Sequence, residues 1–157
     1  MTEKRTTTLI KLLSAIETNI PHFEKRNSSV SQVTIGWHLN HTLKVINRVT
    51  AILIKTNPEK YKKKFNLMRA TLFPLCYIPR GKAKAPKVVI PSKIITKEDI
   101  INQLQEAKIQ IEKTKSLPKK SHFIHHIFGM LSKKQTLYFL EMHTKHHLKI
   151  VNDILNK

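Results

Sequence analysis

The sequence predicts an all-α protein, a four-helix bundle in up-down-down-up order with a long crossover between its second and third helices. Only three glycines occur in 157 residues, and the apolar residues fall into long segments with helical spacing. The crossover, residues 58–96, is long enough for the second and third helices to run parallel, whereas the short first and last connections require antiparallel neighbours. With 40% hydrophobic residues, the chain suits one domain over residues 1–157.

The first two helices are predicted from apolar residues three or four positions apart. Residues 6–20 carry such a stripe, and a proline closes it. A polar loop follows at residues 27–31. The second helix runs from about residue 33 to residue 56, where Asn57-Pro58 stops it.

The crossover is predicted to be mostly extended. Residues 61–75 can form a basic helix, but prolines interrupt the chain from there on. These prolines are Pro74, Pro79, Pro86 and Pro91.

Two helices are predicted after the crossover. Thr96 and Asp99 form a capping-box pattern that starts the third helix, which ends before Pro118. A histidine-rich loop at residues 122–129 then leads to the last helix, from Ser132 to about residue 155.

The chain is strongly basic, with 29 Lys and Arg against 10 Asp and Glu and a formal net charge of +19. Such an excess can attract nucleic acid or an anionic substrate, or it can simply keep a lysine-rich surface solvated. Only five of these residues are arginines, so bidentate recognition of bases and phosphates is scarce. A basic anion- or nucleic-acid-binding helical protein without catalysis is therefore the alternative function.

The sequence predicts neither export nor membrane insertion. Lys11, Ser14 and Glu17 interrupt the N-terminal apolar residues, which a signal-peptide core would not tolerate. No run approaches the roughly 18 to 20 apolar residues that span a bilayer. Cys76 is the single cysteine, which excludes an internal disulfide. We expect a cytoplasmic protein.

Two histidines fall in the middle of the apolar face of the last helix. At about 100° per residue, His143 and His147 lie within the apolar stripe, and His146 lies at its margin. Histidines at i and i+4 can direct two nitrogens to one ion, as in zinc-binding helices. One buried imidazole is usually a core residue, but two adjacent ones need partners for all their nitrogens, and a metal ion with acceptors behind the ligands provides them.

A third ligand is expected from the second helix, where His38 and His41 are three positions apart. Periodicity slightly favours His38, which is nearer the centre of the apolar face. His41 lies about 10 Å from the start of its helix and His147 about 12 Å from the end of the other, so the two meet at one level if the helices are antiparallel. The pattern alone leaves the choice open.

These residues resemble motifs of the DinB/YfiT-like superfamily of metal-binding four-helix bundles. Trp37 precedes His41 by four positions, as a tryptophan precedes the ligand histidine of the superfamily's second helix, and His143-x-x-x-His147 resembles its last-helix pair. The resemblance implies that His41, His143 and His147 bind Ni, Zn or a similar divalent ion, and it favours His41 over His38. It also implies a homodimer.

A narrower resemblance is to an uncharacterised branch of that superfamily, a domain of unknown function with a Pro-Arg-Gly-Lys crossover motif. Residues 79–87 carry this motif. Residues 125–129, His-His-Ile-Phe-Gly, stand where the branch often has His-Pro-x-Phe-Gly, so that His126 replaces the proline. The matching features cover most of the chain, from about residue 35 onwards.

The superfamily includes thiol-dependent transferases and isomerases in which the metal polarises a thiol or water. The resemblance therefore implies a metal-dependent hydrolase or a thiol-dependent transferase with a small-molecule substrate and a low-molecular-weight thiol. A three-histidine site with an open position can lower the pKa of bound water or thiol. No carboxylate is obviously placed as a base.

Two further groups of residues are candidates. Arg80, Lys82 and Lys84, around the glycine of the crossover, can bind an anion or form a solvated loop. His125 and the other histidines of its loop are expected about 20 Å along the helix axis from His143, too far to share its metal. A second metal site that uses His125 is therefore a separate hypothesis.

Overall fold

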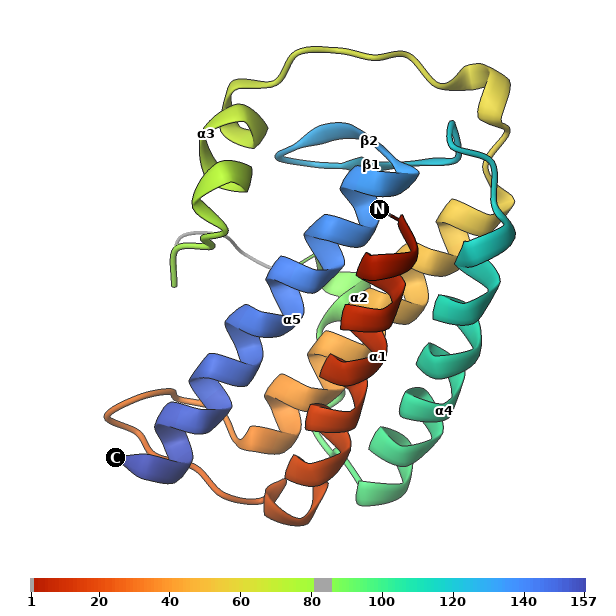
Figure 1. The fold of residues 1–157 in the computed structure, drawn as a ribbon. Coiled ribbons are helices and arrows are strands. Elements are labelled where there is room, and N and C mark those ends of the chain that lie inside the picture. The colour runs from red at the N-terminus through yellow and green to blue at the C-terminus, as the bar shows by residue number, and fades with distance from the viewer. Residues whose placement is uncertain (1, 81–85) are drawn as a thin grey trace.

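The computed structural model describes residues 2–80 and 86–157, which are mainly helical. Four long helices pack as a bundle, and Figure 1 shows two of them running down the view and two running up it. The first pair is α1 (Thr2–Asn19) and α5 (Lys133–Asn156), and the second is α2 (Ile35–Lys55) and α4 (Lys97–Lys113). Both α1 and α2 pack against α4 and α5.

Polar caps start three of the long helices at the residues that follow the loops. The hydroxyl of Thr34 accepts a hydrogen bond from the backbone of α2. Thr96 and Asp99 form a complete capping box at α4, and Ser132 and Gln135 form another at α5. Such a cap contributes about 1 kcal/mol, because it satisfies N–H groups that have no partner within the helix.

The bundle core is filled by leucine and isoleucine from all four long helices. Burying one such side chain contributes roughly 1.5–3 kcal/mol. The fully buried side chains include Leu9, Leu13, Ile16, Leu39, Leu43, Ile46, Ile100, Leu104, Ile111, Leu137 and Leu140.

The all-α prediction missed a β-hairpin in the segment expected to be a histidine-rich loop. Strands β1 (His122–His125) and β2 (Gly129–Ser132) pair antiparallel, with His125 opposite Gly129. Gly129 has φ +67°, a left-handed conformation that suits glycine at the end of a three-residue hairpin loop. Because a two-stranded hairpin is marginal alone, its packing against α2 and α5 stabilises it.

The crossover contains a fifth helix, α3 (Leu67–Leu75), within the segment where a basic helix was expected. Figure 1 shows the chain passing above the hairpin before α3 descends beside α5. The Arg69 guanidinium ties α3 to the hairpin by donating to the carbonyls of Phe128 and Met130, at 3.1 and 2.9 Å.

Short 3-10 turns complete the connections. They are η1 (Ile20–His22), η2 (Pro58–Lys60), η3 (Lys87–Val89) and η4 (Thr114–Ser116). The η3 turn packs against α2, which brings the backbone of the crossover next to the second-helix histidines.

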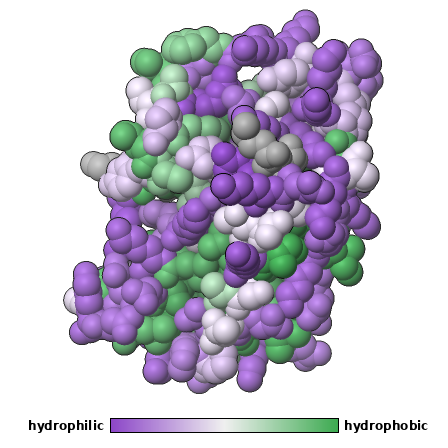
Figure 2. Space-filling view, viewed as in Figure 1, coloured by the Kyte–Doolittle hydropathy of each residue, from purple (hydrophilic) through white to green (hydrophobic). Residues whose placement is uncertain are grey.

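The face shown in Figure 2 is predominantly hydrophilic. Purple hydrophilic side chains cover most of it, and green apolar side chains appear over the α3 region at the upper left and across the lower half of the view. Exposed apolar side chains of that region include Phe65, Leu67, Met68, Leu75 and Tyr77. Within the described ranges, none of the helices combines the length and apolar character needed to cross a membrane.

Candidate metal centre

The first turn of α2 is fixed against the preceding loop, which sets the position of the histidines that follow. The Gly36 N–H donates to the carbonyl of Phe23 at 2.7 Å. A Cβ at Gly36 would lie 2.9 Å from that carbonyl oxygen, so only glycine allows this close approach. The indole ring of Trp37 then stacks on His41, with ring centroids 5.0 Å apart.

His41 of α2 meets His143 and His147 of α5 where the two helices pack. One nitrogen from each imidazole lies within 4.8 Å of the other two, so the three residues could hold a metal ion. The ring centroid of His41 lies 5.2 Å from that of His143 and 4.9 Å from that of His147. The set contains His41 rather than His38.

The tautomer of His41 is set by the crossover. Its Nδ1 lies 2.8 Å from the carbonyl oxygen of Val89. Because a carbonyl can only accept, Nδ1 carries the hydrogen and Nε2 keeps a free lone pair. Metal-binding histidines are oriented in this way, with the other nitrogen donating to a fixed acceptor.

His38 lies behind His147 in a chain of hydrogen bonds. The Nδ1 atoms of the two rings are 3.0 Å apart, and His38 Nε2 is 2.9 Å from the hydroxyl of Ser31. If His147 binds an ion through Nε2, its Nδ1–H donates to His38, whose own Nε2–H then donates to Ser31. In that direction the chain of hydrogen bonds leaves the lone pair of His147 Nε2 free for a metal.

His143 contains a fully buried nitrogen without a hydrogen bond. Its Nδ1 has no hydrogen-bond partner in the described part of the chain. An unpartnered buried polar atom is costly, typically by about 1–3 kcal/mol. A metal ion bound through Nδ1 would supply the missing partner, so the donor set fits such an ion.

Burial keeps the cluster neutral. It lowers the pKa of His143 and His147 well below the ordinary value of 6.5, and the neighbouring imidazoles lower it further. Burial also lowers the pKa of His41, and lowers that of His38 to about 4. The rings are therefore unprotonated at neutral pH, which is the form that binds metals.

The three histidines lie on the wall of a pocket of about 580 Å³. Its sides are α2, α5, the hairpin and the η3 turn. The described residues that line it are mostly apolar and include no aspartate or glutamate. An ion bound here would have room beside it for a small molecule.

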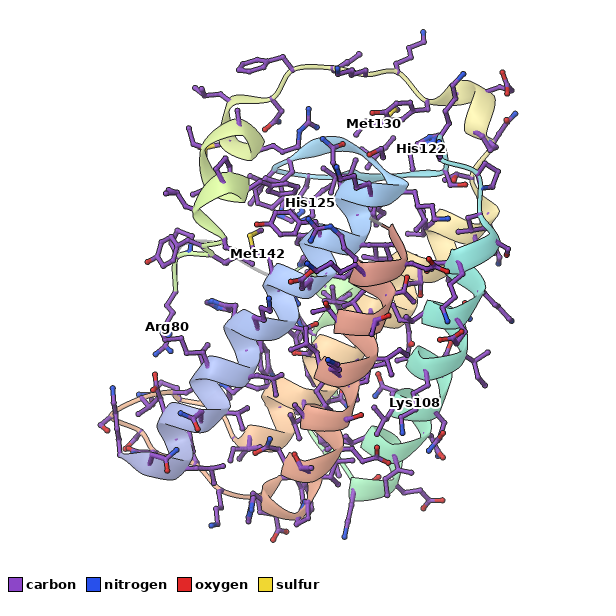
Figure 3. All side chains as sticks on the ribbon, in the orientation of Figure 1. Arg80, Lys108, His122, His125, Met130 and Met142 are labelled. Atoms are coloured by element: carbon purple, nitrogen blue, oxygen red, sulfur yellow. The ribbon has the colours of Figure 1, made fainter. Side chains whose placement is uncertain are left out.

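The expectation that His125 lies about 20 Å from His143 is wrong. The ring centroid of Phe139 is 4.6 Å from that of His125 and 5.7 Å from that of His143, so the two histidines are at most about 10 Å apart. The hairpin folds back over the start of α5, and Figure 3 shows His125 beneath it, beside that helix. His125 and His146 line the pocket but stand outside the set of three.

The anion-binding candidates are only partly placed. Arg80 lines the pocket, and its guanidinium pairs with Asp153 of α5 at 2.8 Å. Lys82 and Lys84 lie outside the described residues.

Sequence reasoning missed the groups behind the ligands. The Val89 carbonyl belongs to the backbone, so no residue type announces it, and Ser31 was expected only in a polar loop. The His38 spacing, three residues before His41, was the one available signal for a second imidazole at this site. No family model, curated protein or solved structure matches the chain.

Proposed function

We propose that the protein binds one divalent metal ion through His41, His143 and His147, and uses it to activate water or a thiol. The observation that carries this proposal is the convergence of three neutral imidazoles, one with an unpartnered buried nitrogen, on the wall of a pocket. Neutral nitrogen donors suit Zn and Ni. A bound ion of this kind lowers the pKa of water or thiol and so supplies a nucleophile near neutral pH.

The chain's own residues would provide orientation and a dry environment. The Val89 carbonyl holds His41 in the tautomer that binds metal, and His38 can accept a hydrogen bond from Nδ1–H of metal-bound His147. The apolar pocket walls limit water beside the site. Since the described lining contains no carboxylate, the reaction would depend on an ionised nucleophile rather than on a neighbouring carboxylate base.

We also infer a place in the DinB/YfiT-like superfamily, as a metal-dependent hydrolase or a thiol-dependent transferase. The supporting features are the long crossover between the second and third long helices, the pairing of Trp37 with His41, and the pair on the last helix.

The test uses the protein loaded with Co²⁺, whose absorption spectrum reports its ligands. Addition of 2-mercaptoethanol should produce a thiolate-to-cobalt charge-transfer band if the open position takes a thiol. A change in the visible spectrum with pH near neutrality, without thiol, should appear if bound water ionises. His143→Ala, the matched control, should show neither. Cobalt binding with no response to thiol or pH would contradict the proposed activation.

A further inference from the structure

His125 is held at the edge of the pocket by the turn of its hairpin. Its Nδ1 accepts hydrogen bonds from the backbone N–H groups of Ile127 and Phe128, at 3.1 and 3.3 Å. Because these groups only donate, Nδ1 carries no hydrogen. Burial, with a contribution from His126, lowers the pKa of His125 to about 4. The ring is therefore neutral at physiological pH, with its one hydrogen on Nε2.

The Nε2–H group of His125 is a fixed donor. It has no hydrogen-bond partner among the described residues, and His125 lines the pocket wall. The ring stacks with His126 and Phe128, at centroid distances of 4.5 and 4.7 Å, and Phe139 meets it edge-on. These contacts prevent the ring from turning away.

The rest of the pocket favours a negative ligand. Its described lining contains two arginines, Arg48 and Arg80, and no acidic residue, although Asp153 outside the lining pairs with Arg80. A divalent ion held by neutral imidazoles would add further positive charge. The apolar part of the wall suits a hydrocarbon or aromatic body, and it includes Val45, Val49, Ile52, Phe123, Phe128 and Phe139.

We propose that the pocket binds a small organic anion with an apolar body, of the carboxylate class, and that His125 donates a hydrogen bond from Nε2 to its oxyanion. This inference rests on the proposed metal centre, which supplies the neighbouring positive charge. The separation of at most about 10 Å between the rings of His125 and His143 allows one small molecule to reach both. A neutral imidazole donor can stabilise negative charge on oxygen in this way.

The experiment measures benzoate binding to the cobalt-loaded protein by the change in its visible spectrum. The spectrum before benzoate is added reports the metal site by itself. The informative variant is His125→Asn, because the amide oxygen of Asn can accept the same turn N–H groups while the Nε2–H donor is lost. His22→Asn is the matched control, since it makes the same change at a histidine outside the pocket lining.

We expect His125→Asn to weaken benzoate binding by about 10- to 100-fold, the range for a lost hydrogen bond to a charged group. Its cobalt spectrum and thermal midpoint should match those of the wild type, and His22→Asn should bind benzoate normally. Equal benzoate affinity in His125→Asn and wild type would overturn the inference, as would a cobalt-loaded wild type that does not bind benzoate. Failure to bind cobalt at all would instead overturn the metal centre, and this inference with it.

Discussion

His41 and His125 line the same pocket, but the hydrogen bonds made by Nδ1 of the two rings run in opposite directions. His41 Nδ1 faces a backbone carbonyl, which leaves the lone pair of Nε2 free. His125 Nδ1 faces backbone N–H groups, which leaves Nε2 with its hydrogen. The first ring is therefore prepared to bind a metal, and the second is prepared to donate to an anion.

The difference teaches that the backbone around a histidine decides what its second nitrogen can do. Burial lowers the pKa of both rings. Burial alone therefore does not separate a ligand from a donor. The 3-10 turn that presents Val89 and the hairpin turn that presents Ile127 and Phe128 separate them.

The largest expected effect comes from removing each ring in turn. His41→Ala should lose more than 100-fold in metal affinity, beyond the 10–100-fold typical of groups behind the ligands. His125→Ala should keep about one ion per chain, because its nitrogens do not belong to the set of three. Equilibrium dialysis with elemental analysis measures both. Equal loss of metal in the two variants would remove the distinction between the rings.

Acid should destabilise the metal-free protein through the protonation of His38 and His125. His38 and His125 have pKa values lowered from 6.5 to about 4 in the folded chain, so the unfolded chain binds more protons between these pH values. Stability is therefore complete above pH 6.5 and declines as pH falls towards 4. For His38 alone the full loss is about 3 kcal/mol.

Urea unfolding of the metal-free protein at pH 7.5, 5.5 and 4.5 measures this decline. His38→Asn and His125→Asn do not titrate, so each should flatten the pH dependence. A wild-type midpoint that is unchanged or higher at pH 4.5 would show that these rings are not neutral in the folded chain.

A smaller effect on metal affinity is expected from His38, which lies behind the ligand His147. His38→Ala should weaken metal binding by about 10- to 100-fold, because His147 loses the group that orients it. His38→Asn should lose less, since its amide oxygen can accept near the position of Nδ1. Competition with a metal-binding dye measures the affinities. A His38→Ala variant with wild-type affinity would leave the hydrogen-bond chain to Ser31 without a role in metal binding.

The smallest effect on stability and metal affinity is expected from a substitution far from the pocket. Lys108 of α4 pairs with Glu17 of α1 at 2.8 Å on the surface (Figure 3). Lys108→Ala should change the free energy of unfolding by less than about 1 kcal/mol, as for most exposed ion pairs, and should leave metal affinity unchanged. Denaturant unfolding and the same dye competition provide the baseline for the histidine variants.

Local patterns predicted the helices well and the arrangement around the pocket only in part. The capping signals at Thr96 and Ser132 mark where α4 and α5 begin, because a cap is a local hydrogen bond. The apolar stripe of the last helix correctly indicated that His143 and His147 share one face. Both inferences need only residues that are close in sequence.

The features that were not predicted depend on contacts between segments that are distant in the sequence. The hairpin has two strands of four residues each, too short to show a clear alternation, and it carries His125 back to the pocket. Glu141 is buried and pairs with Arg5 at 2.9 Å because α1 packs on that side of α5. No pattern within either segment announces such a partner.

The most direct test of the central claim is the metal-to-protein ratio of the purified chain, with identification of the element, before and after reconstitution with Zn²⁺, Ni²⁺ or Co²⁺. We predict about one divalent ion per chain in the wild type and almost none when His143 and His147 are both replaced by Ala. A wild type that stays metal-free after reconstitution, or a double variant that keeps a full equivalent, would contradict the assignment of His41, His143 and His147 as a metal centre.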